Sequence, residues 1–249
     1  MRGPLANLPR YHAVHLHIPC FNANRYLSTI STDARSQKSR ASDGLLRLMP
    51  LGGSVTRGVG SSHGAGYRKP LLQLLEDQGI NSCMVGSRKD GSIPNNEHEG
   101  WRGFRIDEVE KKAKKTVKCL SPDIFMVNAG SNDCIQVFNT AEAGRRMSQM
   151  LDSLWLACPQ STILLSTLIP NADRQVDLMV KDLNDQFRAL AEKKKNEQKK
   201  ILLVDMHSSE GPGAYELVDG IHPGDGGYEK MAELWFRGIQ ETIKKGFID

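Results

Sequence analysis

Strand-sized apolar runs alternate with amphipathic helical segments from Leu45 to Lys245, and this alternation most constrains the fold. The run Thr162–Leu168 shows no polar alternation, as a strand buried on both faces requires. Such an alternation predicts one α/β domain with a five-stranded parallel sheet covered by helices on both sides. The predicted strands are residues 45–51, 80–85, 123–127, 162–168 and 201–204, and the predicted helices are residues 67–78, 106–120, 141–157, 176–192 and 227–245.

The charge of the chain is concentrated at its beginning. Residues 1–43 carry six Lys or Arg and two Asp, whereas the other 206 residues carry 27 basic and 27 acidic side chains. Residues 44–249 therefore carry no net charge, and their composition gives no reason to expect nucleic acid or an acidic protein as a partner. The lysines of residues 111–118 and 193–200 are typical of solvated helix faces.

Residues 1–43 lack hydrophobic periodicity, so the predicted domain covers residues 44–249. The basic segment is typical of a disordered extension, and its low acid content also resembles an organelle transit peptide; a misplaced start site is a third reading. It lacks the apolar core of a secretory signal, and no run in the chain is long enough to span a membrane. Five scattered cysteines without a CxxC pair indicate no zinc site, and we expect no metal or cofactor.

An apolar run ends at Gly52 and leads through Gly53 into Ser54 and a glycine-rich turn. Open α/β sheets bind their ligands at the carboxyl ends of the strands, which is where Ser54 is predicted to lie. A serine in this place is either a nucleophile or the cap of the following helix.

Three further loops are expected at the same edge. Gly86 follows the second predicted strand, Asn132 follows the third, and Asp219 and His222 lie in a turn before the last helix. Acyl transfer needs a hydroxyl, an imidazole, a carboxylate that orients the imidazole, and donors for the oxyanion. Ser54, His222 and Asp219 suit the first three tasks, and the N–H groups of Ser54 and Gly86 with the Asn132 amide suit the last.

Other polar residues offer alternatives to this set. Asp205 and His207, directly after the fifth strand, are a rival carboxylate and base, although the loop of His222 is freer to reach Ser54. The long loop Lys89–Gly103 is of a length that is usually functional. In it, Trp101 is either a surface for sugar stacking or a buried aromatic residue, and His98 is a candidate for lining the pocket.

The blocks Gly52–Val55, Gly86, Gly130–Asp133 and Asp219–His222 resemble, in order, the four blocks of the SGNH (GDSL) hydrolase superfamily. The chain is most similar to carbohydrate esterase family 3, the acetyl xylan esterase type, through Met49–Gly66, Asn132–Cys134 and His222–Asp225. The resemblance implies a three-layer, flavodoxin-like α/β/α sandwich. It also implies a Ser54/Asp219/His222 triad and an oxyanion hole formed by Ser54, Gly86 and Asn132. Gly53 departs from the family pattern, which has aspartate before the serine.

These observations predict a metal-free serine esterase that acts on small acyl esters, in particular acetyl esters of carbohydrate. The expected partner is a small-molecule or polysaccharide ester, and the protein is expected to be a monomer. The resemblance implies export from the cell. A lysophospholipase or thioesterase would share the triad, and a non-catalytic binding module of the same fold is the alternative that Gly53 raises.

Overall fold

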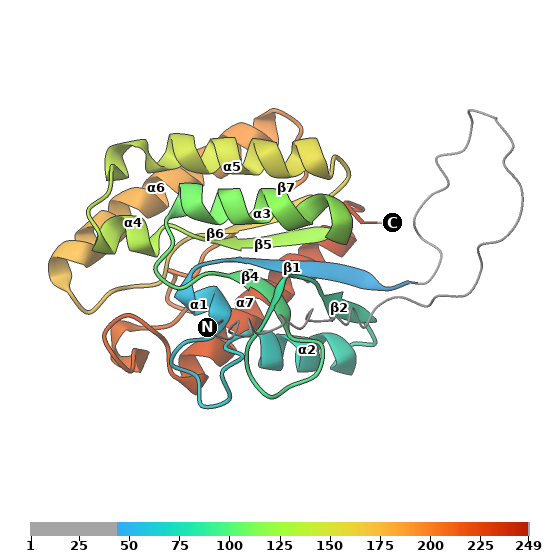
Figure 1. Cartoon of the computed structure of the whole chain (residues 1–249), viewed down its shortest axis with the longest axis horizontal. Helices are drawn as coiled ribbons and strands as arrows, with labels where there is room; N and C mark the ends of the chain where they lie inside the picture. Colours follow the sequence, from blue (N-terminus) through green and yellow to red (C-terminus); the bar gives the residue numbers. More distant parts are fainter. Residues whose placement is uncertain (1–43, 249) are drawn as a thin grey trace, which may run out of the picture. The chain divides into compact units, whose positions relative to one another are not determined.

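The computed structural model describes residues 44–248, so the predicted extension at residues 1–43 lies outside the described part of the chain. Within that part, seven strands form one sheet (Figure 1). The strand order is β3-β4-β1-β5-β6-β7, and β2 pairs with β1. The parallel strands place their carboxyl ends at one edge, beside α1 in Figure 1.

The five strands predicted from the sequence are present, and neighbouring ones are parallel. They are β1 (Leu46–Gly52), β2 (Ser82–Met84), β5 (Ile124–Asn128), β6 (Thr162–Ser166) and β7 (Ile201–Val204). If these five strands are numbered in chain order, they lie across the sheet in the order 2-1-3-4-5, which is the flavodoxin-like arrangement. The predicted fold class is therefore confirmed.

The number of strands predicted was too small. A hairpin formed by β3 (Arg88–Lys89) and β4 (Glu97–Gly100) lies in the segment predicted as a long loop, and β4 extends the sheet along the end of β1. The polar sequence of β4 has little intrinsic strand preference. It forms a strand because its backbone pairs with β1 and its buried side chains find internal partners: Glu99 Oε1 accepts from Ser87 N at 2.8 Å.

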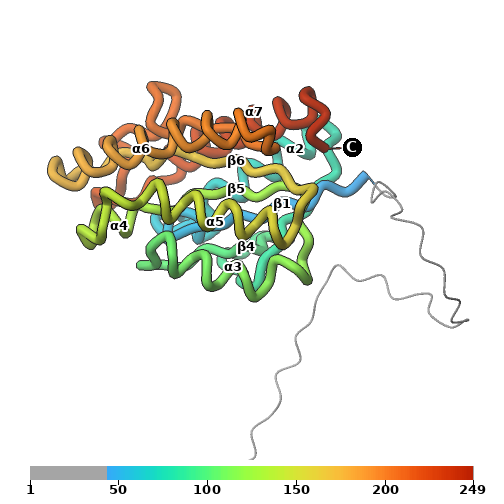
Figure 2. Tube along the Cα trace, turned by 90° about the horizontal axis from the view of Figure 1, so that it is seen from above, coloured from blue at the N-terminus to red at the C-terminus, as the bar shows by residue number. Residues whose placement is uncertain are grey.

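Two layers of helices enclose the sheet. On one face, α3 (Ile106–Leu120), α5 (Ala143–Ala157) and α6 (Arg174–Asn196) lie side by side in that order (Figure 2). On the other face lie α2 (Arg68–Asp77) and α7 (Asp225–Lys244). The arrangement is the predicted three-layer sandwich.

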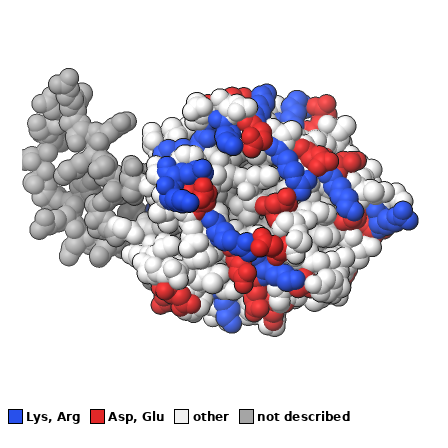
Figure 3. Space-filling model, turned by 180° about the vertical axis from the view of Figure 1, so that it is seen from behind, with Lys and Arg blue, Asp and Glu red and all other residues white. Residues whose placement is uncertain are grey.

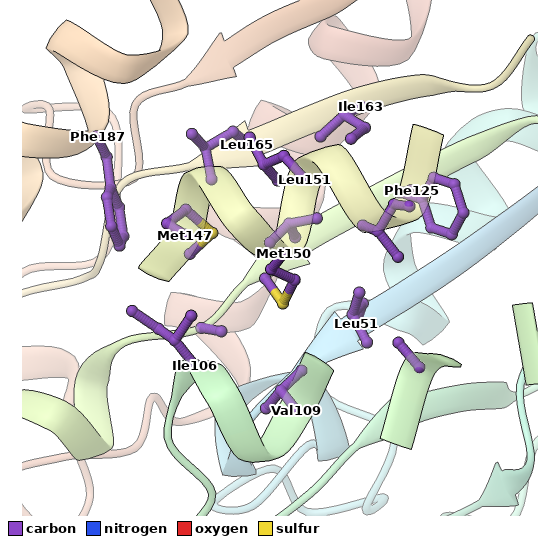
Figure 4. Packing of buried hydrophobic residues seen from close by; sticks show 14 of the residues in the cluster. Leu51, Ile106, Val109, Phe125, Met147, Met150, Leu151, Ile163, Leu165 and Phe187 are labelled. Carbon is purple, nitrogen blue, oxygen red and sulfur yellow. The ribbon is translucent and has the colours of Figure 1, made fainter. Parts of the chain in front are cut away.

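Successive residues of the central strands point to opposite helical layers. Leu51 and Phe125 belong to the core beneath α3 and α5, where they face Val109 and Met150 (Figure 4). Leu48, on the other face of β1, packs in the core beneath α2 and α7. Each such side chain, when fully buried, contributes roughly 1.5–3 kcal/mol to stability. The strands are therefore held from both sides, which fixes the edge where they end.

Helix α6 begins two residues earlier than the apolar periodicity predicted, because Asp173 caps it. The Asp173 carboxylate accepts hydrogen bonds from the backbone N–H groups of Gln175 at 2.8 Å and Val176 at 3.1 Å. These groups have no partner within the helix, so the cap stabilises the first turn.

The surface carries charges of both signs. On the face shown in Figure 3, Lys and Arg side chains are interspersed with Asp and Glu. The helices of the described residues include none whose length and apolar content would let it cross a bilayer.

Candidate active site

Ser54 lies directly after the end of β1, as the first residue of the short helix α1 (Ser54–Arg57). A Cβ atom on Gly52 would lie only 2.0 Å from the carbonyl oxygen of Asn128, so glycine is needed for this close approach of β1 to β5. Gly53 is the N-cap of α1, and no side chain caps the helix. The capping role considered for the Ser54 hydroxyl is therefore not the one that the structure shows.

The Ser54 hydroxyl is instead paired with an imidazole that is 168 positions away in the sequence. His222 Nε2 lies 2.7 Å from Ser54 Oγ, and His222 Nδ1 lies 2.7 Å from Asp219 Oδ2. Because the carboxylate accepts a hydrogen bond from the Nδ1–H group, the proton stays on Nδ1 and Nε2 is free to accept the hydrogen bond from the serine. The three side chains thus have the geometry of a proton relay.

The turn that carries Asp219 and His222 is held by its own hydrogen bonds. Asp219 Oδ1 accepts from the backbone N–H groups of Ile221 at 3.0 Å and His222 at 2.8 Å. Partial burial raises the pKa of the Asp219 carboxyl, but the hydrogen bonds from the His222 ring and from these two N–H groups outweigh it, so the pKa lies below its usual value. Asp219 therefore stays ionised and keeps the imidazole oriented.

The rival pair, Asp205 and His207, is engaged elsewhere. Asp205 accepts hydrogen bonds from Thr167 Oγ1 at 2.8 Å and from the Arg188 guanidinium, and His207 Nδ1 lies 3.1 Å from Leu168 O. Neither ring nitrogen of His207 is hydrogen-bonded to Ser54. The geometry favours His222 as the partner of the serine.

Asn132 reaches the beginning of α1 from the end of β5. It is the second residue of α4 (Ser131–Ile135), whose N-cap Gly130 has a φ of +129°. A Cβ atom on Gly53 would lie 3.2 Å from Asn132 Nδ2, so the amide lies beside the residue that precedes Ser54. One N–H of the amide donates to Phe104 O at 2.9 Å, which leaves the second for a ligand.

Gly86 is not brought to this edge. A Cβ atom there would lie 2.3 Å from the carbonyl carbon of His98, and the neighbouring Val85 donates its N–H to Leu48, in the middle of β1. Strand β4 occupies the end of β1 in its place, and β4 continues into Trp101, whose N–H donates to Gly52 O at 2.8 Å. The hairpin, which was not predicted, thus separates Gly86 from Ser54.

A glycine that the sequence analysis did not single out lies closer to Asn132. Gly103 is exposed with a φ of +79°, and the backbone N–H of Gly103 donates to no atom of the described residues. Its carbonyl oxygen accepts from Gln136 Nε2 at 2.9 Å, and the next residue, Phe104, accepts from Asn132. The signal in the sequence was a second glycine after Gly100, three residues before the predicted helix 106–120.

His98 is fully buried, so it is not exposed to a substrate. Its Nδ1 accepts from the Gly100 N–H at 2.9 Å, and its Nε2 lies 3.1 Å from Asp90 Oδ2. Burial, with repulsion from Arg68, lowers the pKa of His98 to about 3. The ring is therefore a neutral part of the structure that supports β4.

Trp101 is partly exposed, but its ring has several protein neighbours. The Arg88 guanidinium lies 4.5 Å and the Lys112 ammonium 4.2 Å from the ring centroid, and Phe104 stacks at 5.6 Å. Its indole N–H donates to Glu99 Oε2 at 3.1 Å. These contacts fit the role of an aromatic residue that holds the loop 101–105 in place. Among residues 44–248, no three His, Cys, Asp or Glu side chains are grouped so that they could hold a metal ion.

The comparisons with known proteins agree with this arrangement. The model of a family described as the GDSL-like Lipase/Acylhydrolase family matches residues 51–230. A multidomain esterase of Ruminococcus flavefaciens is 26% identical over 251 residues, covering 88% of this chain and 31% of that protein. The chain thus spans about a third of the length of this relative.

Two solved structures share the fold. A family 3 carbohydrate esterase of Clostridium thermocellum aligns with a TM-score of 0.71 and 24% identity, covering 80% of this chain and 98% of that one. A family 3 carbohydrate esterase of Talaromyces cellulolyticus aligns with a TM-score of 0.70 and 21% identity, covering 80% and 99%. The resemblance inferred from the four sequence blocks is confirmed.

Proposed function

Because the chain belongs to the GDSL-like lipase/acylhydrolase family, a family of carboxylic ester hydrolases, we propose that it hydrolyses small acyl esters with Ser54 as nucleophile. The observation that carries the proposal is the relay of two 2.7 Å contacts from Ser54 through His222 to Asp219. A hydroxyl is a weak nucleophile until an adjacent base accepts its proton, and this relay supplies that base.

In the first half of the reaction, Ser54 Oγ attacks the ester carbonyl carbon while its proton moves to His222 Nε2. The ionised Asp219 stabilises the resulting imidazolium. When the tetrahedral intermediate collapses, the bond to the alcohol oxygen breaks, and His222 returns the proton to that oxygen. The alcohol leaves, and the acyl group remains on Ser54.

In the second half, water replaces the alcohol. His222 accepts a proton from the water, whose oxygen attacks the acyl carbonyl, and the bond to Ser54 Oγ then breaks. The proton passes from His222 to Ser54, which restores the resting enzyme and releases the acid. No other reactant is needed.

The oxyanion of both intermediates would be bound by three donors. The N–H of Ser54 lies in the first turn of α1, where N–H groups have no partner within the helix. The second N–H of the Asn132 amide faces the same backbone. We assign the third donor to the N–H of Gly103 in place of Gly86, because Gly103 lies on the loop to which Asn132 is tethered.

The acyl group is proposed to be acetyl and the alcohol a carbohydrate hydroxyl. Support comes from the relatives, which include two family 3 carbohydrate esterases and an acetyl esterase described with a bound acetate ion. The Ruminococcus flavefaciens relative is likewise described as an esterase.

Hydrolysis of a series of p-nitrophenyl esters tests the proposal. We expect the highest kcat/KM for the acetyl ester and a steady fall toward the octanoyl ester. The Ser54→Ala variant should lose about 10³-fold or more in kcat. Ser153→Ala, which removes an equivalent hydroxyl from α5, serves as the matched control and should retain full activity.

Three other results would contradict parts of the proposal. A preference for octanoyl esters would point to a lysophospholipase or thioesterase with the same triad. A folded protein with no activity on any ester would point to a binding module. Unchanged activity of Ser54→Ala would remove the nucleophile itself.

A further inference from the structure

Tyr215 is an unusual aromatic residue in this protein because it lies almost completely in solvent. Its exposed fraction is 85%, whereas Tyr67, Tyr228 and Trp235 are fully buried. It belongs to a short 3-10 helix, Ala214–Glu216, in the segment between β7 and α7. Single exposed apolar residues are common on protein surfaces, and a ring left in water contributes little to folding, so the ring is free to contact a ligand.

The ring nevertheless has contacts within the protein. It lies against the backbone of Gly213, where a Cβ atom would come within 2.4 Å of Tyr215 Cε1. Tyr215 also contacts Lys230, whose Nζ lies 3.4 Å from the tyrosine hydroxyl and 5.6 Å from the centroid of the ring. Lys230 is itself bound to Glu216 at 2.8 Å. Contacts of this kind restrict the rotamers of a ring, so less conformational entropy is lost when a ligand binds.

The same segment is joined to the catalytic turn. Gly224 donates its N–H to Glu216 O at 2.8 Å, Leu217 forms a bridge with Pro223, and Val218 donates to His222 O at 2.9 Å. Tyr215 is three residues from Val218, a span of at most about 10 Å, and Val218 pairs with His222 about 5 Å further across the ladder, so Tyr215 lies within roughly 15 Å of His222. A ligand that extends out of the site on this side would meet the ring.

We propose that Tyr215 is a carbohydrate-binding platform that stacks against a pyranose ring adjacent to the esterified sugar. The proposal rests on the function proposed above, in which the leaving group is a carbohydrate hydroxyl. The apolar C–H face of a pyranose suits an exposed aromatic face. The ammonium of Lys230 can donate hydrogen bonds to the hydroxyl groups of the sugar, and the carboxylate of Glu216 can accept hydrogen bonds from them.

The surroundings distinguish this ligand from an acyl chain. A long acyl chain gains affinity from a dry apolar groove, whereas charged groups border the Tyr215 ring. The other aromatic candidate, Trp101, already contacts Arg88, Lys112 and Phe104. Of these two residues, Tyr215 is the more exposed and therefore the more available to a sugar.

The test compares two acetyl esters that differ in the alcohol. Kinetic constants are measured with acetylated xylo-oligosaccharides and with p-nitrophenyl acetate for the wild type, Tyr215→Ala, Tyr215→Phe and Leu156→Ala. Leu156 is equally exposed, at 85%, but lies near the end of α5 and serves as the matched control.

We expect Tyr215→Ala to raise KM for the oligosaccharides by about five- to tenfold, as the loss of one stacking contact would. Its kcat and KM for p-nitrophenyl acetate should equal those of the wild type. Tyr215→Phe keeps the ring and should keep the affinity, and Leu156→Ala should change neither substrate. Unacetylated xylo-oligosaccharides should inhibit p-nitrophenyl acetate hydrolysis by the wild type but only weakly by Tyr215→Ala.

The proposal is overturned if Tyr215→Ala leaves the oligosaccharide KM unchanged, or if it changes both substrates equally. These outcomes leave the esterase function standing, because they are read from an active enzyme. Absence of wild-type activity on both esters would instead overturn the proposed function.

Discussion

Asp133 Oδ2 accepts a hydrogen bond from the backbone N–H of Ile106 at 3.2 Å, which ties the residue after Asn132 to the first residue of α3. The other carboxylate oxygen is paired with Arg146 on α5. Asp133 is fully buried, so both contacts are shielded from water. One carboxylate thus joins the two backbone segments that carry the proposed oxyanion donors.

Asp133→Asn should destabilise the protein by about 3–5 kcal/mol, because the change removes the buried counter-ion of the Arg146 guanidinium and leaves it only the more exposed Asp107. Asp107, a more exposed partner of Arg146 at 3.3 Å, offers the matched control: Asp107→Asn should cost less than about 1 kcal/mol. Urea unfolding measures both. Equal losses from the two substitutions would show that burial of the pair does not matter.

Asp219→Asn should lower kcat by about 10⁴-fold with a small change in KM, because an amide that donates to Nδ1 would put the proton of the imidazole on Nε2. The neighbouring Asp225→Asn serves as a control, since Asp225 bonds to the Ser62 N–H and not to the imidazole of His222. A tenfold or smaller loss for Asp219→Asn would mean that the imidazole is oriented by other groups.

Asn132→Ala should lower kcat by about 10²–10³-fold, the usual effect of removing one oxyanion donor. The substitution also removes the hydrogen bond to Phe104, so a control for loop position is needed. Gln136→Ala removes the second tether of the same loop, at Gly103, and leaves the Asn132 amide intact. If both variants lose activity equally, Asn132 acts only by holding the loop.

Gly103→Ala should lower kcat about tenfold, because a side chain at a φ of +79° strains the backbone and moves the N–H assigned to the oxyanion. Gly79→Ala is closely matched: its φ is +68°, and a Cβ atom meets no neighbour at either glycine. Each substitution should cost about 1 kcal/mol of stability. Loss of activity in Gly103→Ala alone would support the assignment, and full activity in both would contradict it.

The buried His98 makes stability depend on pH. Its pKa of about 3 in the folded protein is below the unfolded value of about 6.5, so between these values the unfolded chain binds a proton that the folded one excludes. Its contribution is complete above pH 6.5 and falls with decreasing pH by at most about 1.4 kcal/mol per unit. Urea unfolding between pH 7 and 5 should show a smaller slope for His98→Gln, and an unchanged slope would exclude His98 as the cause.

The sequence allowed the sheet and the proximity of Ser54, His222 and Asp219 to be predicted because each depends on local signals. The apolar run ending at Gly52 marks a buried strand, and Asp219 and His222 are close enough in sequence to pair within one turn. The proximity of Asp219 and His222 to Ser54 was predicted from the rule that parallel strands place their carboxyl ends at one edge of the sheet.

The donor that we propose at Gly103 could not be predicted, because the course of the chain before it depends on a strand with no apolar pattern. Polar Glu97–Gly100 forms β4 only through pairing with β1 and through buried partners such as the Ser87 N–H. That pairing is a tertiary contact, and the segment has no hydrophobic periodicity from which a strand could be predicted. Gly86 is instead the glycine that the sequence indicates, because it follows the second predicted strand.

The most direct test of the account is to label the nucleophile with a fluorophosphonate, whose phosphorus bonds to the attacking oxygen as fluoride leaves, and to identify the modified residue by mass spectrometry. We expect one adduct per chain, on the peptide that contains Ser54, and much slower labelling of His222→Ala at equal folded concentration, because the base that activates the hydroxyl is missing. An adduct on another serine, or labelling of His222→Ala at the wild-type rate, would contradict the assignment of Ser54 and His222 as nucleophile and base.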